Sequence, residues 1–263
     1  MLQILAMFLV LSPGPHPILA QDSDGSKVIM AIFAHPDDEM TVAPILSKYV
    51  NEGVKVYLVV CTDGRLGIND FTDHKAGEGL VAIRKKEMKC ASEKLGVELI
   101  HLDYHDQLRA AEGYDGHVPH ARELILELER IVTDKKPDVL ISWGPDGGST
   151  HRDHRLVGAS VTQVFLSKPW AKPKNLYYVG TPSHLIDEPE RKILAGIDST
   201  YLNVGIKYSK KDAEKAMESL KCHKSQISPD LLKWREESSK KSGSVIYFRQ
   251  FVEPKVSSNS LFD

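Results

Sequence analysis

Two short clusters of histidine and acidic residues have the composition of a metal site. The sequence HPDDE occupies residues 35–39, and the sequence HRDH occupies residues 151–154. Imidazole and carboxylate groups are ordinary zinc ligands, and a catalytic zinc ion generally keeps three protein ligands and one open position for water. His35, Asp38 and one histidine of the second cluster would meet this requirement, and an adjacent carboxylate would stay free to move protons. Together the clusters indicate a metal site with a carboxylate that can transfer protons.

Each cluster also has a structural explanation that requires no metal. Acidic residues in the first turn of a helix complement the positive end of the helix dipole, and proline is common there too. Asp153 could in a similar way cap a solvated helix. Capping gives no reason for an imidazole at position 35, however, and residues 151 and 154 share one face if their segment is helical. The metal interpretation therefore depends on whether the fold brings the two clusters together.

The residues around the clusters predict alternating strands and helices. Residues 27–33 (KVIMAIF) and 54–60 (VKVYLVV) are compact apolar runs typical of buried strands, and residues 41–51 between them have helical spacing. The alternation continues with predicted helices at 79–95 and 120–135 and predicted strands at 97–102 and 138–143. Weaker patterns predict strands near 176–179, 201–204 and 245–251 and a helix at 210–221.

This alternation predicts an α/β fold with a mostly parallel sheet and helices on both faces. Ligands of such sheets bind beyond the carboxyl ends of the strands. Both clusters follow predicted strands, so we expect them at the same edge of the sheet. The chain contains no repeat and no long linker, which predicts a single domain at residues 27–251 and a tail at 252–263.

The composition is that of a globular protein without a preference for polyanions. The chain has 263 residues, of which 41% are hydrophobic and 27% are charged, enough for a sizeable core. Its net charge of −2 disfavours nucleic-acid binding. The motifs G-x-S-x-G, G-x-G-x-x-G and G-x-x-x-x-G-K-[ST] do not occur. Serine-hydrolase and nucleotide-binding functions are therefore disfavoured.

The three cysteines, Cys61, Cys90 and Cys222, are widely spaced. None has a neighbour at metal-ligand spacing, and an odd number cannot pair completely. We expect all three to be buried free thiols.

The first 20 residues have the pattern of a secretory signal peptide. An apolar run from Leu2 to Leu11 precedes a Pro/Gly break and a polar segment after Ala20. The run is much shorter than the ~20 apolar residues of a spanning helix, so we expect no transmembrane segment in the mature chain. Cleavage near Ala20 would export the protein to the periplasm or the extracellular space. An unprocessed leader would leave it in the cytoplasm.

Residues 34–39 (AHPDDE) together with residues 151–154 resemble the paired signature of the PIG-L/LmbE-like family of zinc-dependent N-acetylglucosaminyl de-N-acetylases. The resemblance extends over about residues 28–226 in the right order. Its weaker matches are Thr62, Asp63, Gly64, Arg84, Glu87, Lys215, Ala216, His223, Ser225 and Gln226.

The resemblance implies a Rossmann-like fold in which His35, Asp38 and His154 bind zinc. It also implies that a metal-bound water attacks the substrate and that Asp37 acts first as general base and then as general acid. Zinc lowers the pKa of bound water toward ~7 and polarises a carbonyl, which suits amide hydrolysis. A site of this composition would also accept Fe(II) or another divalent metal ion.

The remaining site residues follow from the same resemblance. His151 would stabilise the oxyanion, and Asp153 would orient the His151 imidazole. Arg84 would approach the sugar hydroxyls, although a solvated cation on the helix surface is an equal alternative. Asp63 would support the substrate site or the metal ligands from outside, or would only form an Asp-Gly turn.

The expected function is hydrolytic removal of the acetyl group from an N-acetylglucosamine-type sugar amide, carried by a small molecule or a glycan. A zinc-dependent esterase for O-acetyl sugars is one alternative, because the same water could attack an ester. A non-catalytic secreted carbohydrate-binding relative is another, although every expected ligand and the expected base are present. The sequence predicts neither the aglycone nor the oligomeric state.

Overall fold

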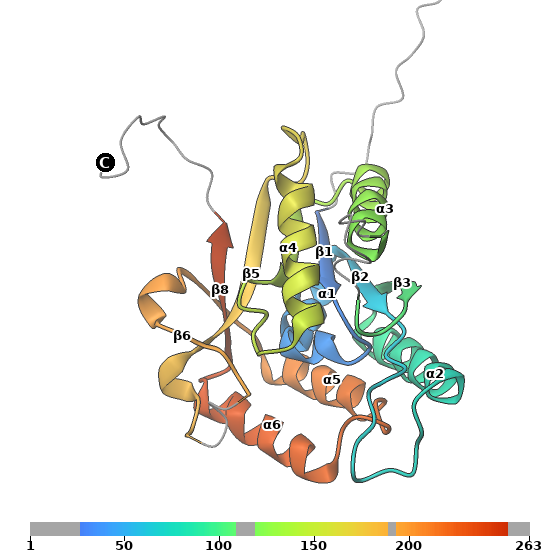
Figure 1. Cartoon of the computed structure of the whole chain (residues 1–263). Helices are drawn as coiled ribbons and strands as arrows, with labels where there is room; N and C mark the ends of the chain where they lie inside the picture. The colour runs from blue at the N-terminus through green and yellow to red at the C-terminus, as the bar shows by residue number, and fades with distance from the viewer. Residues whose placement is uncertain (1–26, 109–118, 189–192, 252–263) are drawn as a thin grey trace, which may run out of the picture.

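The computed structural model describes residues 27–108, 119–188 and 193–251 (Figure 1). The predicted signal peptide at residues 1–20 and the predicted tail at 252–263 lie outside the described residues. Across the three described ranges, no helix combines the length and the apolar character that crossing a membrane requires.

A mostly parallel sheet of eight strands forms the centre of the described fold (Figure 1). Its order is β3-β2-β1-β4-β5-β8-β7, with the short β6 beside β5. The parallel strands are β1 (Val28–Phe33), β2 (Lys55–Thr62), β3 (Glu98–Tyr104), β4 (Val139–Trp143), β5 (Asn175–Pro182) and β6 (Gly196–Ile197). The antiparallel strands are β7 (Val204–Lys207) and β8 (Val245–Phe251).

Helices cover both faces of this sheet. They are α1 (Ala43–Asn51), α2 (Glu78–Leu95), α3 (Pro119–Lys135), α4 (Arg152–Leu166), α5 (Lys210–Leu220) and α6 (Pro229–Lys241). Alternate residues of β1 divide between two cores: Ala31 and Phe33 pack with α1, α2 and α5, whereas Met30 and Ile32 pack with α3 and α4. Burial on both faces explains the continuous apolar run of this strand. The predicted α/β class is confirmed.

Several boundaries differ from the prediction because of local hydrogen bonds. The predicted helix at 41–51 is divided into a 3-10 turn at Asp38–Thr41 and α1, which starts only at Ala43 with proline in its first turn. The predicted strand at 201–204 is wrong over most of its length. The Asp198 side chain accepts the Thr200 N–H and starts a 3-10 turn at Ser199–Tyr201, so β7 begins only at Val204.

A disulfide joins Cys90 of α2 to Cys222 just beyond α5. The expectation of three free thiols is therefore wrong for this pair. The fold places their Cα atoms 5.8 Å apart although 132 residues separate them in sequence, a proximity that spacing could not reveal. Cys61 is the buried free cysteine of the described chain, as predicted.

We expect the double substitution of Cys90→Ser and Cys222→Ser to lower the free energy of unfolding by about 2–4 kcal/mol, because the crosslink no longer restricts the unfolded chain. Urea unfolding followed by circular dichroism measures this difference. The double variant is the control for added reductant, because without the disulfide its free energy of unfolding should be the same with and without reductant. A wild-type chain whose stability is the same with and without reductant would contradict the prediction.

Candidate metal centre

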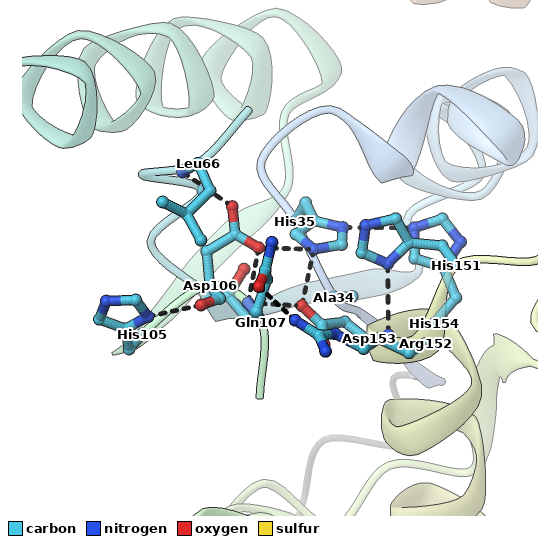
Figure 2. Close-up of polar contacts among 12 residues, drawn as sticks. Ala34, His35, Leu66, His105, Asp106, Gln107, His151, Arg152, Asp153 and His154 are labelled. Atoms are coloured by element: carbon cyan, nitrogen blue, oxygen red, sulfur yellow. Dashed lines mark hydrogen bonds and ion pairs between the residues drawn. The ribbon is translucent and has the colours of Figure 1, made fainter. Parts of the chain in front are cut away.

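The two histidine clusters meet at the carboxyl edge of the sheet. Residues 35–39 follow β1, residues 151–154 follow the loop after β4, and β1 pairs with β4 in parallel. Glycine lets this loop stay close to β4: Gly148 has a φ of 65°, and a Cβ there would lie 2.6 Å from the Trp143 ring. The close path of the loop sets the histidines at the start of α4 beside His35 (Figure 2).

The three predicted metal ligands converge. His35 Nδ1 lies 3.2 Å from His154 Nε2, Asp38 Oδ1 lies 3.2 Å from His154 Nε2, and Asp38 Oδ2 lies 3.6 Å from His35 Nδ1. Zinc bonds of ~2.0–2.1 Å in a tetrahedral site place ligand atoms roughly 3.3–3.4 Å apart. The spacings of His154 Nε2 from His35 Nδ1 and from Asp38 Oδ1, and the chemistry of these three groups, therefore fit a divalent metal ion such as zinc.

Contacts outside the ligand set hold each ligand in place. His154 stacks on Trp143 with 4.6 Å between ring centroids, and its Nδ1 lies 3.0 Å from the Gly147 carbonyl oxygen. The Asp38 carboxylate accepts the backbone N–H groups of residues 34 and 35. Such outer contacts fix the tautomer and orientation of metal-binding side chains. They leave His154 Nε2 and His35 Nδ1 directed at the same point.

His35 Nε2 faces two buried carboxylates, Asp106 Oδ1 at 3.3 Å and Asp153 Oδ2 at 3.2 Å (Figure 2). The family resemblance implies that Asp153 orients the His151 ring, but the Asp153 carboxylate lies on the other side, at His35 Nε2 and the Gln107 N–H. The start of α4 causes this, because the side chain of residue 153 turns inward and is fully buried. Asp106 follows the carboxyl end of β3, where a pocket role is possible from the sequence, but it was not among the predicted ligands or catalytic residues, and its contact with His35 was not predicted.

The charges in this cluster favour a bound cation. Burial by itself lowers the pKa of an imidazole, yet three neighbouring carboxylates raise the pKa of His35 well above its usual value. Burial also lowers the pKa of His154, but the neighbouring Asp38 carboxylate outweighs this effect and raises it. Burial would raise the pKa of Asp38, but His154 and His35 hold it well below its usual value. A divalent cation would supply the positive charge that these carboxylates attract.

Asp37 lies beside the predicted ligands and lines the adjoining pocket. Its side chain is 22% exposed, and Oδ1 pairs with Arg84 Nη2 at 3.2 Å. Burial raises the pKa of Asp37, and Arg84 offsets only part of this rise. Its backbone is held at a φ of 122°, with its N–H donated to Glu39 Oε2. Strain of this kind is common where a side chain must point at a reacting group.

We expect the Asp37→Gly variant to be more stable than Asp37→Ala by about 1 kcal/mol. Alanine in this strained backbone conformation costs about 1–3 kcal/mol. Glycine avoids that cost, but its greater freedom in the unfolded chain offsets roughly 0.5–1 kcal/mol of the gain. Both variants lack the carboxylate, so their difference in free energy of unfolding isolates the backbone. Equal stabilities in urea would show that position 37 is unstrained.

His151 is exposed and lies against both histidine ligands, with ring centroids 4.6 Å from His35 and 4.8 Å from His154. Burial of its ring, followed by the repulsion from these two imidazoles, lowers its pKa. Its Nδ1 accepts the Asp153 N–H and caps α4. A neutral His151 therefore carries its proton on Nε2, which stays available as a donor.

Arg84 and Asp63 lie behind the site. Arg84 is 3% exposed and donates to the Pro36 and Gly64 carbonyls, so the alternative of a solvated helix cation is wrong. Asp63 is 2% exposed, pairs with Arg65 and accepts the Asp106 N–H. Both residues therefore fix the loops that carry site residues. Their contact with a substrate remains a prediction.

The weaker C-terminal matches also reach the site. His223 Nε2 lies 2.7 Å from Glu39 Oε1, and Ser225 donates its N–H and hydroxyl to Glu87. Glu39 in turn accepts the Asp37 N–H. Residues that lie far apart in sequence therefore help to hold the strained backbone of Asp37 in place.

A pocket of about 900 Å³ opens beside the metal centre. Asp37, Asp38 and His154 line one part of it, and α5, α6 and the loop after β5 line the rest. This volume lies within the range of sites for drug-sized ligands. The metal centre is therefore accessible to a substrate considerably larger than a single sugar.

A family model described as PIG-L, GlcNAc-PI de-N-acetylase, matches residues 30–165. A 1D-myo-inositol 2-acetamido-2-deoxy-alpha-D-glucopyranoside deacetylase of Corynebacterium glutamicum is 30% identical over 156 residues, covering 52% of each chain. A mycothiol S-conjugate amidase of Streptomyces coelicolor is 35% identical over 177 residues, covering 57% of this chain and 59% of the relative. The chain thus spans about half the length of the curated relatives it matches.

Solved structures share the fold at low sequence identity. N,N'-diacetylchitobiose deacetylase from Pyrococcus horikoshii has a TM-score of 0.63 and 22% identity, covering 86% of this chain and 84% of that one. GalB, the 4-carboxy-2-hydroxymuconate hydratase of Pseudomonas putida, also has a TM-score of 0.63, with 14% identity and coverage of 89% and 99%. Because this fold carries both reactions, the reaction must be argued from the site.

Proposed function

The chain belongs to the PIG-L family, and from this membership we propose that it is a metal-dependent hydrolase that removes the acetyl group from an N-acetylglucosamine-type amide. The observation that carries the proposal is the convergence of His35, Asp38 and His154 beside Asp37, whose carboxylate pairs with Arg84. The substrate would be a small molecule or glycan that carries this acetamido sugar, in keeping with the deacetylases to which the chain is similar.

His35, Asp38 and His154 would hold the metal ion, and Asp106 with Asp153 would orient His35. When bound, zinc or another divalent ion supplies Lewis-acid chemistry that polarises a carbonyl and activates water. Asp37 would accept a proton from the attacking water and return it to the amine nitrogen as the C–N bond breaks. His151 Nε2–H would donate a hydrogen bond to the oxygen that becomes negative.

Release of free amine from N-acetylglucosamine and its glycosides tests this function on protein of measured metal content. We expect about one metal ion per chain, as for a three-ligand catalytic site. A chelator should abolish amine release, and added zinc should restore it. The matched O-acetyl sugars separate amide from ester hydrolysis. A chain that binds no divalent metal, or one that cleaves only the esters, would contradict the proposal.

We also propose that the protein is exported after cleavage near Ala20. The Cys90–Cys222 disulfide supports this, because disulfides persist mainly in oxidising compartments. Mass spectrometry of the protein from fractionated cells tests it. Cytoplasmic protein that retains Met1 would refute export without affecting the proposed hydrolysis.

A further inference from the structure

The part of the pocket that α6 lines is apolar, unlike the metal centre. Apolar side chains from the loop after β5, from α5 and from α6 line it. They include Leu185, Ile193, Leu194, Met217, Leu231 and Trp234. Both helices lie at the lower end of the sheet in Figure 1, the end to which the parallel strands run. A sugar bound at the metal centre would therefore have its aglycone directed toward an apolar wall.

One cation in this apolar region has no counter-ion. Among the described residues, the lysines and arginines that line the pocket are Lys210, Arg235, Lys240 and Lys241. Each of the three lysines pairs with a carboxylate at 3.7 Å or less. Within the same described ranges, Arg235 makes neither a hydrogen bond nor an ion pair, and its Nε is buried without a partner. Arg235 is therefore the pocket cation available to a ligand.

The position of Arg235 makes this lack of a partner significant. Its guanidinium lies 5.3 Å from the centre of the Trp234 ring, a contact that holds a planar cation without neutralising it. Burial lowers the pKa of Arg235 to about 10, so the group remains charged at neutral pH. An unpaired charge in an apolar environment is costly, and guanidinium binds carboxylate and phosphate groups through paired hydrogen bonds.

We propose that this pocket binds the aglycone of the substrate and that Arg235 binds an anionic group on it, a carboxylate or a phosphate. The aglycone would combine this anion with an apolar chain or ring, which packs against Leu194, Met217 and Trp234. This assignment of the pocket rests on the proposed hydrolysis at the adjacent metal centre. The anion-binding property of Arg235 itself does not require turnover.

The test measures binding of three probes that share one apolar chain: octyl phosphate, octanoate and octyl β-glucoside. Isothermal titration calorimetry on the metal-loaded protein, below the aggregation concentration of each probe, gives the dissociation constants. We expect at least one anionic probe to bind about 10-fold or more tighter than the neutral glucoside, as for a charge-assisted contact. Comparison of octyl phosphate with octanoate shows which anion Arg235 prefers.

The Arg235→Gln variant should lose this preference for the anion, and Arg235→Lys should keep part of it because the charge remains. The matched control is Lys233→Gln, which removes an exposed cation of the same helix that does not line the pocket and should leave the preference for the anion unchanged. A preference that persists in Arg235→Gln would place the anion at the metal centre and overturn the proposal. Equal or absent binding of all probes to the wild type would do the same. Anion binding without amine release would refute only the proposed hydrolysis.

Discussion

The Asp37→Asn variant is expected to bind metal as the wild type does and to release amine about 10²–10⁴-fold more slowly. Asparagine cannot accept a proton from water, but it keeps nearly the same shape and tolerates positive φ better than most residues. Asp37 faces the pocket and contacts Arg84, whereas the metal-facing atoms belong to other residues. The measurement is kcat for amine release together with metal content per chain.

Asp70→Asn is the matched control, because it makes the same chemical change at an exposed carboxylate in the segment between the two motifs of the signature. It should leave kcat unchanged. If Asp37→Asn kept most of the wild-type rate, another group would be the base. If it lost its metal, Asp37 would be a ligand, and the division of roles between the two adjacent aspartates would have to be reversed.

The central part of the fold could be predicted because its strands are buried on both faces. Residues 29–33 and 56–61 are almost completely buried, so their apolar runs have few polar interruptions. The outer strand β7 and the helix α6 could not be predicted in the same way. β7 alternates between partly buried and exposed residues, and α6 contains no fully buried residue, so neither carries a strong apolar pattern.

The proximity of residues 35–39 and 151–154 could be predicted because the carboxyl ends of the strands of a parallel sheet lie at one edge. Contacts that depend on tertiary packing could not be predicted. The Glu39–His223 pair spans 184 residues, and the carboxylate of Asp153 could have turned toward either histidine. Asp106 follows β3 and so lies at the same edge of the sheet, but no residue spacing in the sequence pairs its carboxylate with His35.

Arg235 illustrates a different limit of sequence analysis. It lies in a charged run on α6 that has the composition of a solvated helix face. Its neighbours Glu236 and Lys240 do form such a surface pair. All three line the pocket, so only the missing partner distinguishes Arg235 from them, and periodicity does not tell which cation of a mixed run lacks a carboxylate.

The His154→Ala variant is expected to lose both the metal and the activity. His154 Nε2 lies 3.2 Å from atoms of both other ligands, so its removal leaves two ligands where a catalytic zinc generally has three. Loss of an outer contact alone typically weakens metal binding about 10–100-fold, so loss of a ligand should weaken it by more than about 100-fold. Metal content after gel filtration and amine release measure the two effects.

Thermal unfolding separates this loss of binding from a general loss of structure. A ligand at 100 times its dissociation constant stabilises the folded state by about 2.7 kcal/mol, so added zinc should raise the melting temperature of the metal-free wild type. It should not raise that of His154→Ala, while His74→Ala, which removes an exposed histidine, should respond like the wild type. A His154→Ala chain that zinc still stabilises would show that other side chains around His35 hold the metal, either His151 or the buried carboxylates of Asp106 and Asp153, which are potential ligands there as well.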